Sequence, residues 1–306
     1  MSDVAIGIDI GGTRTKSGLV NIKTGEVKKM IVQATEKEDE SKFRFQLTSA
    51  IREHLSFAIQ SDQKVSGIGI GVSSFVDRRG MVDSTYGFLT FMENYPLASV
   101  IEKEFHLSCK VDNDARMVAL GEATYGKGKG FERVLALTLG TGLGVGFVCE
   151  GKFEDQLPHA HMAGHITVTQ NDHHCYCGKT GCLESLVSAA GILYIGEKNS
   201  WTKKYPKIPL TAESIFLAAE EGNKDAQAIV IEWVNYLRIG IHNYINLFAP
   251  QVIVIGGGIA KGIKPYLGVL TANNYLKPFK NYTLAITISE LHEHAGILGA
   301  AARIQL

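Results

Sequence analysis

Short apolar runs interrupted by glycine turns set the pattern of the chain from its first residues. Ala5–Ile10 is apolar, Gly11–Thr13 interrupts the run, and Ser17–Val20 resumes it, which predicts two strands joined by a tight turn. Residues 134–149 repeat this order of apolar strand, Gly–Thr turn and apolar strand. The repetition predicts a weak internal duplication.

Helices are predicted where apolar residues recur at helical spacing. Within Ser41–Gln60 an apolar residue occurs at every fourth position, which is one face of a helix. Further helices are expected over residues 97–105, 114–125, 230–249 and 297–304, and further strands over residues 27–32, 67–72, 109–111, 251–255 and 284–288. Strands mixed with helices in both halves place the chain in the α/β class with mixed sheets.

The length of 306 residues suggests two domains of ordinary size. We expect an N-terminal α/β lobe over residues 1–115, to which a closing helix over residues 292–306 returns. A C-terminal α/β lobe is expected over residues 116–291. No linker rich in Pro, Gly or Ser separates the two parts.

Composition and charge exclude several classes of protein. Hydrophobic residues make up 45% and charged residues 20% of the chain, which is typical of a globular protein. Lys and Arg number 31, as do Asp and Glu, so no excess of positive charge is available for nucleic acid or an anionic membrane. No run approaches about 18 apolar residues, and the N-terminus lacks a signal-peptide pattern. These features predict a cytoplasmic protein.

Three glycine turns, each at the end of a predicted strand, are candidates for binding phosphate. A glycine lets the backbone approach a phosphate with its N–H groups directed at the oxygens, and a carboxylate such as Asp9 can hold Mg²⁺ through water. One such turn alone is more often a tight hairpin, but three together favour a bound nucleotide. They match neither the P-loop nor the dinucleotide fingerprint. The candidate residues are Asp9, Gly11, Gly12, Thr13, Gly140, Thr141, Gly142, Gly257 and Gly258.

The five cysteines are of two kinds. Cys109 and Cys149 stand alone in apolar segments, where a cysteine behaves as a small hydrophobic residue. Cys175, Cys177 and Cys182 lie close together, and three thiolates with one imidazole suit a structural, tetrahedral Zn²⁺ site. The chemistry alone leaves the fourth ligand open among the nearby histidines, which are His165, His173 and His174.

Six segments together resemble one family, the ROK family of sugar kinases and related repressors. They are Asp9–Thr13, Asp112–Asp114, Leu139–Gly144, Gly164–His165, Cys175–Glu184 and Val254–Gly258. The resemblance extends to about Ala301 and implies a two-lobed actin-like ATPase fold, related to ribonuclease H, with a cleft between the lobes. It also implies a sugar and ATP with Mg²⁺ as small-molecule partners, a structural Zn²⁺ and a homodimer.

The same resemblance implies roles for individual residues. Asp114 would be the general base that accepts the proton of the sugar hydroxyl during attack on the γ-phosphate of ATP. From the sequence alone this residue would be a helix cap. Asn113 and Glu184 would hold neighbouring sugar hydroxyls. His165 would be the fourth zinc ligand, with its second ring nitrogen facing the sugar.

Three positions depart from the family pattern. Met162 stands three residues before the zinc histidine, where the family has Glu; Ser73–Ser74 replaces the usual Pro–Gly; and the Asn expected near Gly87–Phe88 is absent. A thioether cannot replace a carboxylate as a hydrogen-bond acceptor. The pocket for the sugar, which accepts the phosphoryl group, is therefore predicted to be altered. His159 and His161 are alternative donors at this end of the pocket.

Three functions compete. An ATP-dependent kinase acting on a hexose or N-acetylhexosamine is favoured because the base and the glycine turns are intact. A repressor would need a DNA-binding segment before Asp9, where the sequence leaves little room. A non-catalytic sugar-binding or regulatory protein without such a segment is the main alternative, and Met162 is its strongest argument.

Overall fold

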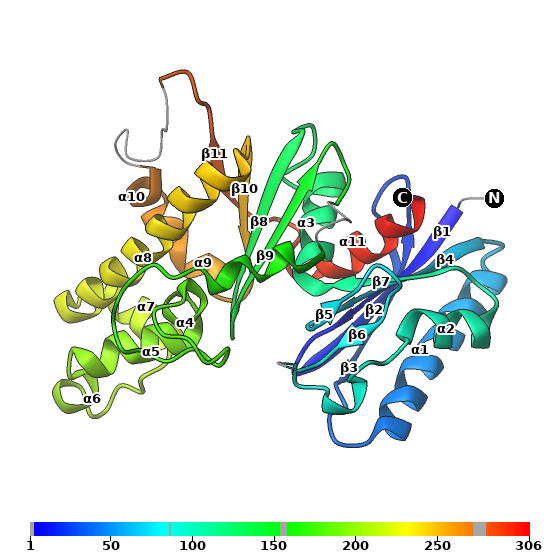
Figure 1. The fold of residues 1–306 in the computed structure, drawn as a ribbon, viewed down its shortest axis with the longest axis horizontal. Helices are drawn as coiled ribbons and strands as arrows, with labels where there is room; N and C mark the ends of the chain where they lie inside the picture. The colour runs from blue at the N-terminus through cyan, green and yellow to red at the C-terminus, as the bar shows by residue number, and fades with distance from the viewer. Residues whose placement is uncertain (1–2, 86, 154–157, 272–279) are drawn as a thin grey trace. The chain divides into compact units, whose positions relative to one another are not determined.

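The computed structural model describes residues 3–85, 87–153, 158–271 and 280–306, and the chain divides into two compact units (Figure 1). The first unit contains residues 1–134, 146–161 and 290–306. The second contains residues 135–145 and 162–289. A mixture of strands and helices makes up each unit, as predicted for the α/β class.

The first unit is built on a five-stranded sheet with the order β3-β2-β1-β4-β7 (Figure 1). β1 (Asp3–Ile10), β2 (Arg14–Asn21) and β3 (Val27–Ala34) are consecutive and antiparallel. β4 (Lys64–Val72) pairs in parallel with β1 and with β7 (Cys109–Asn113). Because β1, β4 and β7 run in one direction, the segments that follow these three strands meet at the same edge of the sheet.

Helices cover both faces of this sheet because alternate residues of a strand point to opposite sides. The even-numbered apolar residues of β1 share a core with α1 (Glu40–Gln60) and α2 (Leu97–Phe105). Ala5 lies in a separate core with α11 (Ala295–Ala302). α11 also packs along α3 (Asp114–Tyr125). The result is a layer of helices on each side of the strands.

Glycine on the strands permits the close approach of α11. A Cβ on Gly7 would collide with the backbone carbonyl of Ile297, and one on Gly69 with that of Ala300. Any larger residue would push the helix away from the sheet. The closing helix expected from the sequence is therefore held against the N-terminal strands, and the short turn η6 (Arg303–Gln305) follows it.

The first unit extends beyond residue 115, where the sequence suggested a boundary, as far as residue 134. α3 begins at that point and packs tightly on α11: a Cβ on Gly299 would collide with the carbonyl of Met117. At the far end of α3, the hydroxyl of Tyr125 donates to Ile22 O at 2.7 Å. These contacts keep α3 with the N-terminal sheet.

A second sheet has the order β11-β10-β8-β9, and most of its residues belong to the second unit. Its strands are β8 (Arg133–Leu139), β9 (Leu143–Cys149), β10 (Val252–Gly256) and β11 (Ala285–Ile288). β10 and β11 are parallel. The strands expected from the repeated Gly–Thr pattern are therefore β8 and β9, with the turn between them.

The long helix α8 (Lys224–Phe248) begins before residue 230, where its apolar pattern starts. Asn223 caps it, since the side chain accepts from Ala226 N at 3.0 Å. The first turn contains Lys224, Asp225 and Gln227, and such polar residues carry no hydrophobic periodicity. The cap rather than the periodicity marks the true start.

Short elements complete both units. In the first unit they are β5 (Phe75–Val76), β6 (Val82–Asp83), η1 (Thr90–Met92) and η5 (His292–His294). The remaining elements are η2 (Pro158–His165), α4 (Leu183–Val187), α5 (Ala189–Lys198), α6 (Trp201–Lys204), α7 (Ala212–Glu220), α9 (Ala260–Ile263), η3 (Lys264–Tyr266) and α10 (Leu267–Thr271). Among the described residues, no helix has both the length and the apolar character that a membrane crossing requires.

Candidate functional site

The first glycine turn joins β1 to β2, and backbone hydrogen bonds fix its shape. Gly11 N donates to Arg14 O at 3.1 Å and closes the turn. Thr35, which follows β3, donates from its hydroxyl to Gly11 O at 2.7 Å and from its N–H to Thr13 O at 3.1 Å. The sequence analysis missed Thr35, because only the pairing of β2 with β3 brings it to this turn.

Two carboxylates lie at the edge of the first sheet where β1 and β7 end. Burial raises the pKa of Asp9 to about 6; the negative charge of Asp114 adds to this effect, and Lys16 opposes it. Burial also raises the pKa of Asp114. Lys16 Nζ lies 3.9 Å from Asp9 Oδ2 and 3.9 Å from Glu293 Oε2. Two carboxylates that repel each other in a buried place are typical of a functional site.

Asn113, rather than Asp114, is the N-cap residue of α3. Its Oδ1 accepts from two backbone N–H groups of the first helical turn, and its Nδ2 donates to Ser74 O at 3.2 Å. Asp114 is the first helical residue, and its Oδ1 accepts from Ala115 N at 2.8 Å. A hydrogen bond from the Ser73 side chain favours the ionised form of Asp114 and opposes the effect of burial on its pKa.

A buried ion pair that the sequence analysis missed lies beside these residues. Arg116 Nε is 2.7 Å from Asp112 Oδ1, and both side chains are buried. The guanidinium group lies 4.5 Å from the centre of the Phe153 ring. Because the pair spans the junction of β7 and α3, it fixes the segment that carries Asn113 and Asp114. The spacing of four residues between opposite charges was the available signal.

The second glycine turn lies between β8 and β9 and is in contact with α4. Gly140 N donates to Gly142 O at 3.0 Å, and Gly140 O accepts from Ala189 N at 2.8 Å. A Cβ on Gly142 would collide with Oε1 of Glu184. The turn therefore needs glycine at residue 142, because the carboxylate of Glu184 occupies the space of a side chain.

The third glycine turn follows β10. Gly257 has a φ of +90°, a conformation that residues with a side chain rarely adopt, and a Cβ there would collide with Leu139 O. Leu139 O also accepts from Ile259 N at 3.1 Å. A Cβ on Gly258 would meet no atom within 4 Å. The second and third turns thus lie next to each other, where β8 and β10 end.

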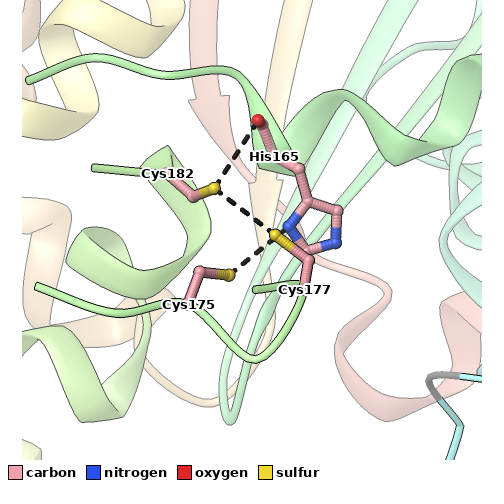
Figure 2. A group of neighbouring side chains, drawn as sticks. All are labelled: His165, Cys175, Cys177 and Cys182. Atoms are coloured by element: carbon pink, nitrogen blue, oxygen red, sulfur yellow. Dashed lines mark hydrogen bonds between the residues drawn. The ribbon is translucent and has the colours of Figure 1, made fainter. Parts of the chain in front are cut away.

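His165, Cys175, Cys177 and Cys182 converge in the second unit, and their possible ligand atoms all lie within 4.8 Å of one another. Figure 2 shows the three sulfur atoms gathered beside the His165 ring. Cys177 Sγ and Cys182 Sγ are 3.7 Å apart. Three thiolates and one imidazole in this arrangement fit a tetrahedral zinc site with four protein ligands.

Of His165, His173 and His174, which the sequence left open, only His165 joins the three cysteines among the residues that the structure describes. The Nδ1 atom of His165 lies 3.6 Å from Cys175 Sγ. His173 instead stacks on Tyr194 at 3.9 Å between ring centres, and its Nε2 is 3.1 Å from Ser185 O. A backbone bridge between Thr167 and Cys182 brings His165 to the cysteine loop. Burial lowers the pKa of His165, which favours the neutral imidazole that binds metal.

The second ring nitrogen of His165 faces Glu184. His165 Nε2 lies 3.4 Å from Glu184 Oε2, and both residues are buried. The hydroxyl of Tyr176 lies 3.3 Å from each Glu184 carboxylate oxygen and 3.3 Å from His165 Nε2. Tyr176 was not among the predicted site residues, because the position between two cysteine ligands gave no sign of contact with Glu184.

The fold is that of the actin-like ATPases. The solved ROK hexokinase of Thermus thermophilus superimposes with a TM-score of 0.82 over 98% of this chain and 97% of that protein, at 26% identity. The sequence model of the ROK family matches residues 5–305. The chain therefore belongs to the ROK family.

Its curated relatives include both an enzyme and a regulator. A glucokinase of Thermotoga maritima is 33% identical over 316 residues, which cover 98% of this chain and 96% of the relative. A xylose repressor of Caldicellulosiruptor bescii is 28% identical over 279 residues, which cover 87% of this chain and 69% of the repressor. The choice between the two activities therefore depends on the site residues.

Proposed function

We propose that the protein is an ATP-dependent sugar kinase that phosphorylates a hydroxyl of a hexose or an N-acetylhexosamine. The observation that carries this proposal is the pair of partly buried carboxylates Asp9 and Asp114, at the edge of the sheet where the first glycine turn lies. The glucokinase of Thermotoga maritima supports the same activity class.

Asp114 is the proposed general base. Its carboxylate takes the proton of the attacking sugar hydroxyl, so that the oxygen becomes a better nucleophile as the bond to phosphorus forms. Burial raises the pKa of Asp114, and hydrogen bonds from Ala115 N and from the Ser73 side chain oppose this effect by favouring the ionised form. The N-cap Asn113 fixes the direction of the helix start and thereby the position of the base.

The glycine turns are the proposed binding site for the nucleotide. Backbone N–H groups at Gly12 and Thr13, and at Thr141 and Gly142, are suited to phosphate oxygens. Gly11 and Gly140 would shape the two turns, because their N–H groups donate within them. Gly257 and Gly258 would contact another part of ATP, because a glycine has no side chain to keep the ligand away from the backbone. Asp9 is the group suited to a hydrated Mg²⁺, which would neutralise charge on the phosphates.

The zinc site is proposed to be structural, with His165, Cys175, Cys177 and Cys182 as ligands. Its effect on function passes through His165: with Nδ1 directed at the metal, Nε2 carries the proton and can donate to a sugar hydroxyl. Glu184 would accept from a neighbouring hydroxyl. For Asn113, the amide Nδ2 is the atom suited to a hydroxyl, because its Oδ1 serves the helix cap. A homodimer is proposed on the family resemblance alone.

The second candidate function is a sugar-responsive regulator without catalysis. Two observations favour it. Met162 stands where the family has Glu, and a xylose repressor is among the relatives. A coupled assay of ADP formation with ATP, Mg²⁺ and a panel of hexoses and N-acetylhexosamines decides between the two. Sugar-dependent ADP release with a phosphorylated sugar in the product mixture supports the kinase. Calorimetric binding of a sugar without any ADP release would leave only the regulator.

A further inference from the structure

Tyr176 combines an exposed ring with a hydroxyl fixed on two buried groups. The residue is 62% exposed, whereas Glu184 and His165, which its hydroxyl contacts, are each 9% exposed. Fixing an exposed side chain costs conformational entropy. Ring contact with His165 is edge-to-face, at 5.2 Å between centres, and leaves most of the phenol ring uncovered. Packing alone therefore does not explain the orientation of Tyr176.

The proposed zinc site would fix the protons in this group. His165 Nδ1 faces Cys175 Sγ, and with Nδ1 bound to the metal the proton of the neutral ring would lie on Nε2. Nε2–H can donate to Glu184 at 3.4 Å or to the Tyr176 oxygen at 3.3 Å. The Tyr176 O–H donates to Glu184. A carboxylate accepts at about four lone-pair positions, so Glu184 keeps acceptor capacity for a ligand beside Tyr176.

We propose that Tyr176 is a specificity-determining residue of the sugar site. This inference rests on the proposed kinase function. The ring offers an apolar face to the C–H side of a pyranose, while its hydroxyl shares Glu184 and His165 with two adjacent sugar hydroxyls. The ligand class is a pyranose with one hydroxyl that donates to Glu184 and a neighbouring hydroxyl that accepts from His165 Nε2.

Two substitutions separate the ring from the hydroxyl. Tyr176→Phe keeps the ring and removes the hydroxyl, whereas Tyr176→Leu removes both. Tyr194→Phe is the matched control, since it deletes a hydroxyl from a tyrosine of the same unit that stacks on His173. Sugar affinity is measured by calorimetry without ATP, and the KM for sugar, the KM for ATP, kcat and the zinc content are measured in parallel.

The expected result is a graded loss confined to the sugar. Tyr176→Phe should weaken sugar binding about 2- to 10-fold, the value of one net hydrogen bond, and Tyr176→Leu should weaken it further. The KM for ATP and the zinc content should stay within about twofold of the native protein, as expected for a contact with the ligand. Tyr194→Phe should match the native protein in all of these measurements.

Three outcomes overturn the inference. If both Tyr176 variants bind and phosphorylate sugar like the native protein, Tyr176 has no role in specificity, although the kinase function stands. If Tyr176→Phe loses zinc in proportion to sugar affinity, the residue only supports the metal loop. If the native protein neither binds nor phosphorylates any sugar of the panel, the proposed function fails first and the inference fails with it.

Discussion

Asn113 and Asp114 are neighbours with different roles: Asn113 caps helix α3, and Asp114 is the proposed general base. Asn113 satisfies the first N–H groups of α3, so the carboxylate of Asp114 is not needed as a cap and can serve chemistry. Burial raises the pKa of Asp114, which means that the ionised group costs folding stability at neutral pH. Function and stability therefore make opposite demands on this residue.

Asp114→Asn should lower kcat by at least about 10² while the KM for ATP changes little, because the amide keeps the shape but accepts no proton. The melting temperature should stay equal or rise, since a buried charge is removed. Steady-state kinetics and calorimetry test both parts, with the exposed Asp62→Asn as control. Near-native turnover in the variant would show that another group is the base.

Ser73→Ala should move the acidic limb of the pH–rate profile to higher pH. The Ser73 side chain favours ionised Asp114, so its removal raises the pKa of the base, and protonation stops catalysis earlier as the pH falls. One hydrogen bond corresponds to about 0.4–1 pH unit. The measurement is kcat/KM between pH 5 and about 8, with Ser74→Ala as control. Identical profiles for all three proteins would contradict the role of Ser73.

His54 should make the protein less stable in acid. It is fully buried on α1, and its Nε2 is 2.9 Å from Ser17 Oγ. Within the described parts of the chain, its Nδ1 has no hydrogen-bond partner. Burial, together with the positive charge of Lys29, lowers its pKa to about 4, and Glu53 opposes this shift. The unfolded chain takes up the proton near pH 6.5, so stability decreases as the pH falls from about 6.5 towards 4.

Urea unfolding at several pH values tests this effect. Between pH 6.5 and 4, the native protein should lose about 3 kcal/mol more unfolding free energy than His54→Gln, which has no proton to take up. The carboxylates titrate alike in both proteins and cancel in the comparison. Equal pH dependence of the two proteins would show that His54 is protonated in the folded state without cost.

Among the elements, the loop that contains Cys175, Cys177 and Cys182 leads to a prediction about metal content. Protein purified without added metal should contain about one zinc per chain. Cys177→Ser should lower the zinc content, the stability and the sugar affinity together, because His165 loses its fixed position. Cys149→Ala is the control, since Cys149 lies on β9 outside the cluster. Elemental analysis that finds a folded, metal-free native protein would exclude the zinc site.

Met162, in the element η2, leads to a prediction about which sugars are good substrates. Met162 is 36% exposed in this segment, and its thioether cannot accept a hydroxyl proton as a carboxylate does. We expect a high KM for unmodified glucose and a lower one for a sugar with an apolar or bulky substituent at this end. Met162→Glu should improve kcat/KM for glucose.

To test this prediction, KM and kcat/KM are measured for glucose and for substituted sugars, in the native protein and in Met162→Glu. His159 and His161, the alternative donors, have side chains outside the described part of the structure. Efficient phosphorylation of glucose by the native protein, with no gain in the variant, would remove Met162 from the determinants of specificity.

Elements with strong periodicity could be predicted from the sequence, whereas contacts between distant segments could not. α1, α2 and α3 begin and end within a residue of the predicted ranges. The early start of α8 was hidden by its polar first turn. The contacts of Thr35, Tyr176 and Ser73 depend on strand pairing and loop geometry, and no local pattern encodes these. The convergence of the three cysteines with His165 could be predicted because their short spacing is typical of a metal-binding loop.

At the scale of the whole molecule, the two structural units are not consecutive stretches of the chain. The first unit takes its last helix from the C-terminus, and α3 stays with it because α11 packs on both α3 and β1. Hydrophobic periodicity shows that these helices are amphipathic or buried, but not against which strand they pack. For this reason the boundary expected at residue 115 moves to residue 134 in the structure.

The short helix α4 joins three parts of the second unit. Cys182 is its N-cap residue, Glu184 lies in its first turn, and Ala189, just after it, donates to Gly140 O. A shift of Cys182 would therefore move Glu184, the proposed sugar-binding acid, together with Ala189, whose N–H fixes the second glycine turn. If the proposed zinc site is emptied, the protein is therefore expected to lose affinity for the nucleotide as well as for the sugar.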